Sequence, residues 1–233
     1  LQTLHPALHG EVDVDVVVIG AGYTGLYTAL NLAEAGKKVA VLEANRVGWG
    51  ASGRNGGQVI LGFSCDMPPF EAALGLDGAR QIWNLTQQAA AEIRQRIARH
   101  QIDCDFRAGH LWTSVLERRL HLLTNWQEEA ASKWGYDGLL FVPKPELPRY
   151  VNSQRYQAGL LDANGGHLHP LKYALGLARA AQAAGVQLFE QSAAQRYVEH
   201  ADGVEVYTAQ GRVRAHALVL ACNTGVGSVA PQV

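Results

Sequence analysis

Residues 14–36 read VDVVVIGAGYTGLYTALNLAEAG, and this stretch decides the fold. Its first six residues are nearly all apolar and β-branched, which is typical of a strand covered on both faces in a parallel sheet. The helical pattern that follows ends at Gly36, a residue suited to the left-handed cap of a helix. The sequence therefore predicts a strand, a tight turn and a helix, in that order.

The turn between this strand and helix carries three glycines with the spacing of a dinucleotide-binding loop. Gly20 permits the turn, Gly22 lets a pyrophosphate approach the backbone, and Gly25 lets the helix lie close to the strand. The helix N-terminus would then face the phosphates, where free N–H groups stabilise an anion. A glycine-rich turn that binds nothing is the alternative. The candidate cofactor-binding residues of this turn are Gly20, Ala21, Gly22, Tyr23, Thr24 and Gly25.

A second short strand is predicted at residues 39–42, and an acidic residue follows it. Glu43 lies about twenty residues beyond the first glycine, where a carboxylate accepts hydrogen bonds from ribose hydroxyls. Its charge also disfavours NADP, because the carboxylate would repel the 2′-phosphate. These residues predict a dinucleotide site and leave the choice between FAD and NAD open, since both cofactors carry ADP.

The long loop after this strand favours FAD. Residues 43–58 read EANRVGWGASGRNGGQ, where a nicotinamide-binding unit would usually proceed to its next helix. Backbone N–H groups of such a glycine-dense loop can wrap a second length of an extended cofactor. For Arg54, a solvated charge in the loop is as good an interpretation as a cofactor contact.

At residues 16–25, 39–43 and 48–58 the chain resembles the FAD-dependent amine and amino-acid oxidase family, which contains D-amino-acid, glycine and sarcosine oxidases. Within that family, the loop looks closest to the branch of gamma-glutamylputrescine oxidoreductases. The resemblance implies that Ala51 and Ser52 lie near the pyrophosphate and ribityl chain, and that residues 55–58 lie beside the isoalloxazine ring. It implies cofactor contacts from Glu43, Ala44, Asn45, Arg46, Gly50, Ala51, Ser52, Arg54, Asn55, Gly56, Gly57 and Gln58. Because no histidine occurs in residues 43–58, the FAD is expected to be noncovalent.

The same resemblance implies an α/β fold, α+β overall, in which a Rossmann-like FAD-binding domain with a β-meander is interleaved with a partial substrate-binding domain. The expected FAD-binding parts are residues 12–76 and 161–233, and residues 77–160 are the expected first part of the substrate domain. The remainder of both domains is expected to lie beyond residue 233, so that this chain alone would be incompetent in turnover. The only methionine is Met67, and we expect the numbering to begin inside a longer gene product or after a removed segment.

The remaining elements are predicted from periodicity and turn residues. Apolar spacing predicts helices at residues 77–99, 116–134 and 170–184. Runs of apolar or alternating residues predict strands at 106–115, 186–189, 194–199, 204–208, 212–214 and 217–221. Three prolines predict a connecting loop over residues 139–150. Residues 162–170 are expected to return the chain to the cofactor domain.

Two further cofactor contacts are implied by the family's meander and by the strand after it. The backbone around Ala193 and Ala194 is expected to contact the adenine. The strand at 217–221 ends where relatives commonly have an alanine-threonine-glycine type of turn, and here Cys222 replaces the threonine. The expected contacts from that turn are Cys222, Asn223 and Gly225.

The implied activity is oxidation of the C–N bond of an amine or amino acid, by hydride transfer to flavin N5 and hydrolysis of the resulting imine. The flavin carries the chemistry, and no catalytic residue is nominated. Three alternatives stay open: an FAD-dependent 2-hydroxy-acid dehydrogenase, a noncatalytic FAD-binding fragment and an NAD-dependent dehydrogenase. The expected partner is a small amine or amino acid.

Composition and charge narrow the class of protein further. Twenty basic and 21 acidic residues give no electrostatic reason to expect nucleic acid or an anionic membrane. Three scattered cysteines favour a reducing compartment, and no apolar run reaches the ~18 residues of a membrane span. Residues 1–10 lack the features of a signal peptide, so a cytoplasmic protein is expected. His167 and His169 alternate like metal ligands without a third ligand nearby, so no metal is expected.

Overall fold

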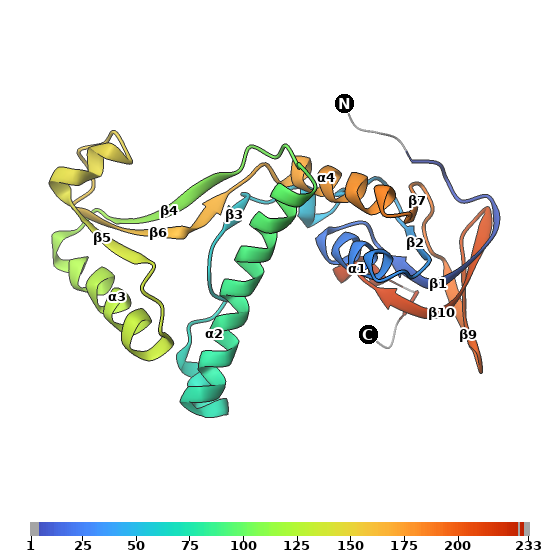
Figure 1. The fold of residues 1–233 in the computed structure, drawn as a ribbon, viewed down its shortest axis with the longest axis horizontal. Coiled ribbons are helices and arrows are strands. Elements are labelled where there is room, and N and C mark those ends of the chain that lie inside the picture. Colours follow the sequence, from blue (N-terminus) through green and yellow to red (C-terminus); the bar gives the residue numbers. More distant parts are fainter. Residues whose placement is uncertain (1–4, 228, 231–233) are drawn as a thin grey trace. The chain divides into compact units, whose positions relative to one another are not determined.

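The computed structural model describes residues 5–227 and 229–230 (Figure 1). Contacts divide the chain into two compact units that alternate along the sequence. Unit 1 comprises Leu1–Gly56, His100–Cys104 and His169–Val233, and unit 2 comprises Gly57–Arg99 and Asp105–Leu168. The predicted functional domains divide the chain after residues 76 and 160 instead. The cofactor and substrate roles of those domains stay predictions.

Unit 1 is built on a six-stranded sheet with strand order β7-β2-β1-β10-β9-β8. Its parallel strands are β1 (Gly10–Ile19), β2 (Val39–Leu42), β7 (Gln187–Phe189) and β10 (Gly211–Leu220). The antiparallel strands β8 (Arg196–His200) and β9 (Gly203–Tyr207) complete it. The helices of this unit are α1 (Tyr23–Glu34) and α4 (Pro170–Ala183). A mixed α/β fold with a parallel sheet was predicted, and this architecture confirms it.

The second half of β1 and all of β2 are buried on both faces, as their apolar composition predicts. Val17 and Ile19 of β1 belong to a core cluster that also takes in residues of β2, β9 and β10. Val16 and Val18 point to the opposite face, because successive side chains of a strand alternate. A Cβ added to Gly25 of α1 would lie 3.3 Å from Val18 Cγ1, so α1 covers that face, and α1 also packs against α4.

The end of the meander differs from the prediction. Residues 212–214 and 217–221 were expected to form two strands, the second of them buried, but both belong to β10. β10 pairs with β1 along its length, whereas only Arg212 to Ala215 pair with β9. Pairing with the long β1 keeps the backbone extended at residues 215–216, between the two predicted strands. Because β9 no longer flanks it, the later half of β10 is half-buried or exposed.

Unit 2 contains a four-stranded antiparallel sheet and two helices. Its strands are β3 (Gln58–Val59), β4 (Arg107–Ser114), β5 (Leu139–Pro143) and β6 (Ala158–His167), and each of the first three pairs with β6. Its helices are α2 (Pro68–Arg99) and α3 (Leu120–Trp134). α2 begins earlier than predicted, and Gly75 interrupts it with φ 71° and ψ 175°, so the predicted helix corresponds to its second segment.

The connecting loop predicted over residues 139–150 of unit 2 is wrong in part. Residues 139–143 form β5, and Lys144–Arg149 form a 3-10 helix. Pro143 is tolerated because it stands at the last position of the strand, where the ladder needs no further N–H donor. Residues 162–167 look like a turn but continue β6, since β3, β4 and β5 supply its hydrogen-bond partners.

A buried carboxylate organises the centre of unit 2. Asp162 is 1% exposed, and its Oδ1 accepts hydrogen bonds from the Tyr136 hydroxyl and, at 2.9 Å, from the Asn164 N–H. Burial, and then the hydrogen bond to Asp162, raises the pKa of the Tyr136 hydroxyl. The Trp83 ring packs edge-on against Tyr136, with ring centroids 5.8 Å apart. The Tyr136 hydroxyl and the Asn164 N–H therefore satisfy one oxygen of this buried carboxylate and offset part of the cost of burying it.

We expect Tyr136→Phe to lower the free energy of unfolding by about 1–3 kcal/mol, because it removes a hydrogen-bond donor from a buried carboxylate. The measurement is a urea unfolding curve. Tyr150→Phe is the matched control, since Tyr150 is 50% exposed and its hydroxyl can bond water. An unchanged midpoint for Tyr136→Phe would contradict the role assigned to this pair.

The described part of the chain has neither a membrane-spanning helix nor a metal cluster. None of the helices there combines the length and the apolar character that crossing a membrane requires. The same residues hold no cluster of three or more His, Cys, Asp or Glu side chains with metal-binding geometry. His169 is the N-cap of α4, and its Nδ1 accepts the Lys172 N–H at 3.4 Å.

Candidate cofactor site

A cavity of about 370 Å³ opens in unit 1 beside the carboxyl ends of β1, β2 and β10. Ligands of open α/β sheets bind in this position, outside the ends of the parallel strands. The predicted site residues that line it are Gly20, Gly22, Tyr23, Thr24, Glu43, Ala44, Asn45, Gly50, Ala51, Ser52, Ala193, Ala194, Cys222, Asn223 and Gly225. The structure therefore brings the glycine loop, the loop after β2, the residues before β8 and the turn after β10 to one place.

The three glycines of the first turn have different surroundings. Gly20 has φ +107°, and a Cβ there would lie 2.6 Å from the Ala221 carbonyl oxygen. A Cβ on Gly25 would lie 1.9 Å from the Gly20 carbonyl oxygen, so the first turn of α1 lies against the backbone of the loop. A Cβ on Gly22 would instead meet the side chain of Ser52, 2.9 Å from its Oγ. Gly22 is thus the glycine whose missing side chain keeps the cavity open.

Ser52 caps the first helix from a distant part of the sequence. It lies in a 3-10 turn (Ala51–Gly53), and its Oγ accepts the N–H of Tyr23, the first residue of α1, at 2.9 Å. The N-cap Gly22 has no side chain to do this. The first turn of α1 carries no acidic residue, so its own side chains do not neutralise the positive end of the helix dipole. This arrangement suits an anionic group such as a pyrophosphate.

Glu43 is held in place by two backbone N–H groups. Its Oε2 accepts the Ala21 N–H at 2.8 Å, and its Oε1 accepts the Asn45 N–H at 2.9 Å. Each carboxylate oxygen has a second lone pair. The carboxylate is therefore oriented at the cavity wall and still has acceptor capacity for hydroxyl groups.

We expect Glu43→Ala to weaken FAD binding by about 1.5–3 kcal/mol, the scale of charge-assisted hydrogen bonds. Flavin fluorescence titration measures the affinity. Glu199→Ala, which removes an exposed carboxylate on β8, is the control and should bind FAD as the wild type does. Equal affinity in Glu43→Ala and wild type would rule out the ribose-binding role.

An aromatic side chain that sequence reasoning missed forms part of the cavity wall. Trp49 lines the cavity and is 51% exposed. Arg54 lies over its ring, 4.6 Å from the centroid, and the Arg54 Nε donates to the Trp49 carbonyl oxygen at 2.6 Å. Arg54 is thus anchored to the wall although it does not line the cavity. The other lining residues that were missed are Ile19, Leu42, Ala221, Val226 and Val229.

The turn after β10 places a thiol near the carboxylate of Glu43. Burial, together with the negative charge of Glu43, raises the pKa of the Cys222 thiol, which favours the neutral form. Asn223 adopts a left-handed conformation with φ 49°, and its Oδ1 accepts the Thr224 N–H at 2.8 Å. Cys222 thus presents a neutral thiol where a threonine hydroxyl was expected.

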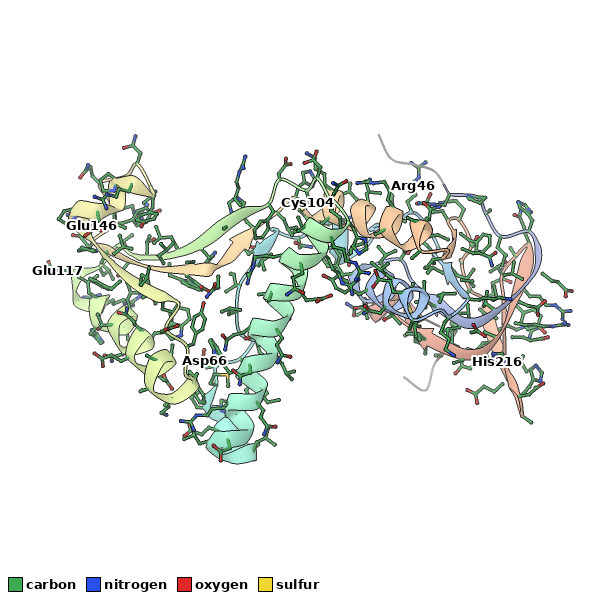
Figure 2. The ribbon with its side chains drawn as sticks, viewed as in Figure 1. Arg46, Asp66, Cys104, Glu117, Glu146 and His216 are labelled. Carbon is green, nitrogen blue, oxygen red and sulfur yellow. The ribbon has the colours of Figure 1, made fainter. Side chains whose placement is uncertain are left out.

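The remaining predicted residues lie outside the cavity lining. Ala21 and Gly25 are buried beneath the glycine loop, and Arg46, labelled in Figure 2, is exposed on the loop after β2. The Asn55 amide donates to the carbonyl oxygens of Ala51 and Ser52 and so supports the 3-10 turn. Gly56 is exposed at the end of this stretch of unit 1. Gly57 and Gln58 belong to unit 2, where Gln58 begins β3.

The glycine loop, the carboxylate of Glu43 and the cavity at the ends of parallel strands have the arrangement typical of a dinucleotide-binding protein. The chain belongs to the DAO family of FAD dependent oxidoreductases, whose family model matches residues 15–233. The family resemblance, the fold class and the FAD cofactor predicted from the sequence are confirmed.

Similar proteins span more residues than this chain does. The chain is 44% identical to the probable oxidoreductase OrdL of Haemophilus influenzae and 41% identical to gamma-glutamylputrescine oxidoreductase of Escherichia coli. Each match covers 94% of this chain and 51% of the relative, so the chain spans about half the length of these curated relatives. It is similar in structure to L-amino acid deaminase from Proteus myxofaciens, with a TM-score of 0.74 and 25% identity over 95% of this chain and 49% of that protein.

Proposed function

We propose that the protein binds FAD in the cavity of unit 1 and oxidises the C–N bond of an amine or amino acid. The observation that carries this proposal is the convergence of Gly22, Ser52 and Glu43 on one cavity at the ends of β1 and β2. When bound, FAD supplies the acceptor for the hydride that leaves the amine-bearing carbon. Family membership supports the same reaction class.

In this proposal, different residues of the cavity bind different parts of the ADP half of the cofactor. Glu43 accepts hydrogen bonds from the adenosine ribose, while the N-terminus of α1 and Ser52 hold the pyrophosphate. The backbone of Ala193 and Ala194 contacts the adenine. The surroundings fit this assignment, since Gly22 leaves room for a phosphate and Glu43 retains free lone pairs.

The flavin half is assigned to the loop that follows. We infer that residues 55–58 lie beside the isoalloxazine ring, and that the flavin is bound noncovalently because residues 43–58 contain no histidine. Asn55 supports this loop through its hydrogen bonds to Ala51 and Ser52. The protein's contribution is then to bind and orient the cofactor rather than to supply a catalytic side chain.

For the substrate, we propose a gamma-glutamylated polyamine. The support is the 41% identity to the Escherichia coli gamma-glutamylputrescine oxidoreductase, together with the glycine-dense loop at residues 48–58. A 2-hydroxy acid is the competing substrate on the same flavin, and no feature of the described residues favours it.

An anaerobic flavin-bleaching screen tests this function. The full-length protein that contains these residues is purified, loaded with FAD and mixed with gamma-glutamylputrescine, putrescine, glycine, several L-amino acids and lactate, and its visible absorbance is followed. Bleaching with an amine, and fastest with gamma-glutamylputrescine, is the expected result. Bleaching by lactate alone would mean that the substrate is a hydroxy acid and not an amine. No bleaching with any compound would favour a noncatalytic FAD-binding protein.

A further inference from the structure

The segment at the end of β7, residues 189–192, is hydrogen-bonded to the loop that carries Glu43. The Glu43 N–H donates to the Phe189 carbonyl oxygen at 2.9 Å, and the Ser192 N–H donates to the Glu43 carbonyl oxygen at 2.9 Å. The backbone and side-chain N–H groups of Gln191 both donate to the Asn45 carbonyl oxygen, at 3.0 and 2.8 Å. The 189–192 segment therefore fixes the backbone on both sides of the ribose carboxylate.

One member of this segment is a buried carboxylate. Glu190 is 1% exposed, and its Oε1 accepts the N–H of Val47 at 2.8 Å. Its Oε2 accepts the N–H of His5 at 3.2 Å. Burial lowers the pKa of the His5 imidazole, although the charge of Glu190 opposes this, so the neutral ring offers no counter-ion at neutral pH. Glu190 thus depends on backbone N–H groups, one of them from the cofactor loop.

The contact at Val47 continues through the loop to the helix N-terminus. The next residue, Gly48, donates its N–H to the Ala21 carbonyl oxygen at 3.0 Å. A Cβ on Gly53 would lie 2.2 Å from the Gly48 carbonyl oxygen, so these two stretches of backbone are in direct contact. Gly53 follows Ser52, which accepts the N–H of Tyr23. A displacement of Val47 would therefore move the groups that face the proposed pyrophosphate.

We propose that Glu190 is a positioning residue of the cofactor site. It holds Val47 so that Glu43 and Ser52, on either side of Val47 in the sequence, keep the geometry that binds the ADP half of FAD. Glu190 is not among the residues that line the cavity, so it acts through the loop. This inference rests on the proposed FAD site and adds a residue to it.

Three variants separate this role from a general contribution to stability. Glu190→Ala leaves the buried Val47 N–H without its acceptor and should raise the dissociation constant for FAD about tenfold, the effect of one lost buried hydrogen bond. Glu190→Gln offers one carbonyl oxygen to two N–H donors and should raise it less, about threefold. Thr208→Ala, outside this segment and outside the cavity lining, removes a hydroxyl that accepts the Gly211 N–H at 3.1 Å in the turn between β9 and β10. It should lower the unfolding midpoint without changing the affinity.

The experiment titrates the purified wild-type and variant proteins with FAD, followed by fluorescence quenching, and with ADP, followed by calorimetry. Both titrations are done below the unfolding midpoint of each variant, as judged by circular dichroism. Weaker binding of both FAD and ADP in the Glu190 variants, with wild-type affinity in Thr208→Ala, is the expected result. If Glu190→Ala fails to fold, the affinity of Glu190→Gln decides.

Wild-type affinity in a folded Glu190 variant would overturn the positioning role, and so would an equal loss in Thr208→Ala. A wild-type protein that binds neither FAD nor ADP would overturn the proposed function itself. The failure of the inference and the failure of the proposed function are therefore distinguishable.

Discussion

Gly22→Val is expected to give a folded protein that no longer binds FAD. The Gly22 backbone has φ −82° and ψ −173°, an extended conformation that valine adopts readily, so this change does not strain the backbone. The added Cβ would lie 2.9 Å from Ser52 Oγ, and the two methyl groups of valine would fill the space proposed for the pyrophosphate. The dissociation constant for FAD should rise at least ~100-fold, which corresponds to about 2.7 kcal/mol.

Circular dichroism and visible absorbance of the purified variant measure this outcome. Thr28→Val is the control, because it places the same side chain on α1 at a position outside the cavity lining. This control should retain its FAD and therefore be yellow. A Gly22→Val protein that carries a full complement of FAD would remove the phosphate site from this loop.

Gly25→Ala is expected to lower the free energy of unfolding strongly, although it adds only one methyl group. The new Cβ would lie 1.9 Å from the Gly20 carbonyl oxygen and 3.3 Å from Val18 Cγ1. Because the first of these atoms belongs to the backbone, no rotamer change relieves the clash, and α1 must move away from β1. Overpacking of a core typically costs about 1–3 kcal/mol and occasionally more, so we expect a loss of ~3 kcal/mol or more.

Urea unfolding of Gly25→Ala against wild type measures this loss. Thr24→Ala, at the preceding exposed position of the same helix, is the control and should change the free energy of unfolding by less than ~0.5 kcal/mol. A wild-type midpoint for Gly25→Ala would mean that α1 does not approach the glycine loop as closely as the structure shows.

The start of the fold could be predicted from the sequence because its signals are local. The apolar run of β1, the glycine turn and the helical spacing of α1 lie within one stretch, and β2 has the exact bounds expected for it. Glycine at positions 20 and 25 is required by contacts with the neighbouring backbone, which their spacing already implied. Such features depend little on distant parts of the chain.

Other elements depend on partners that the sequence does not reveal. β6 contains Asn164, Gly165 and Gly166, which locally favour a turn, yet three strands pair with it. β5 was obscured by the prolines that follow its first residues. In these places long-range hydrogen bonding overrides local propensity.

The candidate site shows the same division between local and distant contacts. The glycine loop and Glu43 were recognisable from spacing, whereas Trp49 joins the cavity through the path of an irregular loop. Glu190 was not predicted, because its bonds to Val47 and His5 join residues far apart in the sequence. The one signal that could have drawn attention to it is the position of a carboxylate directly after β7.

The most direct test of the account is the flavin content of the purified protein. The protein is saturated with FAD, separated from free cofactor by gel filtration and denatured in acid, and the released flavin is measured by absorbance and mass. We predict one FAD per chain in the supernatant and no flavin attached to the precipitated protein. A colourless protein that retains no FAD after saturation would contradict the central claim that this chain forms an FAD site.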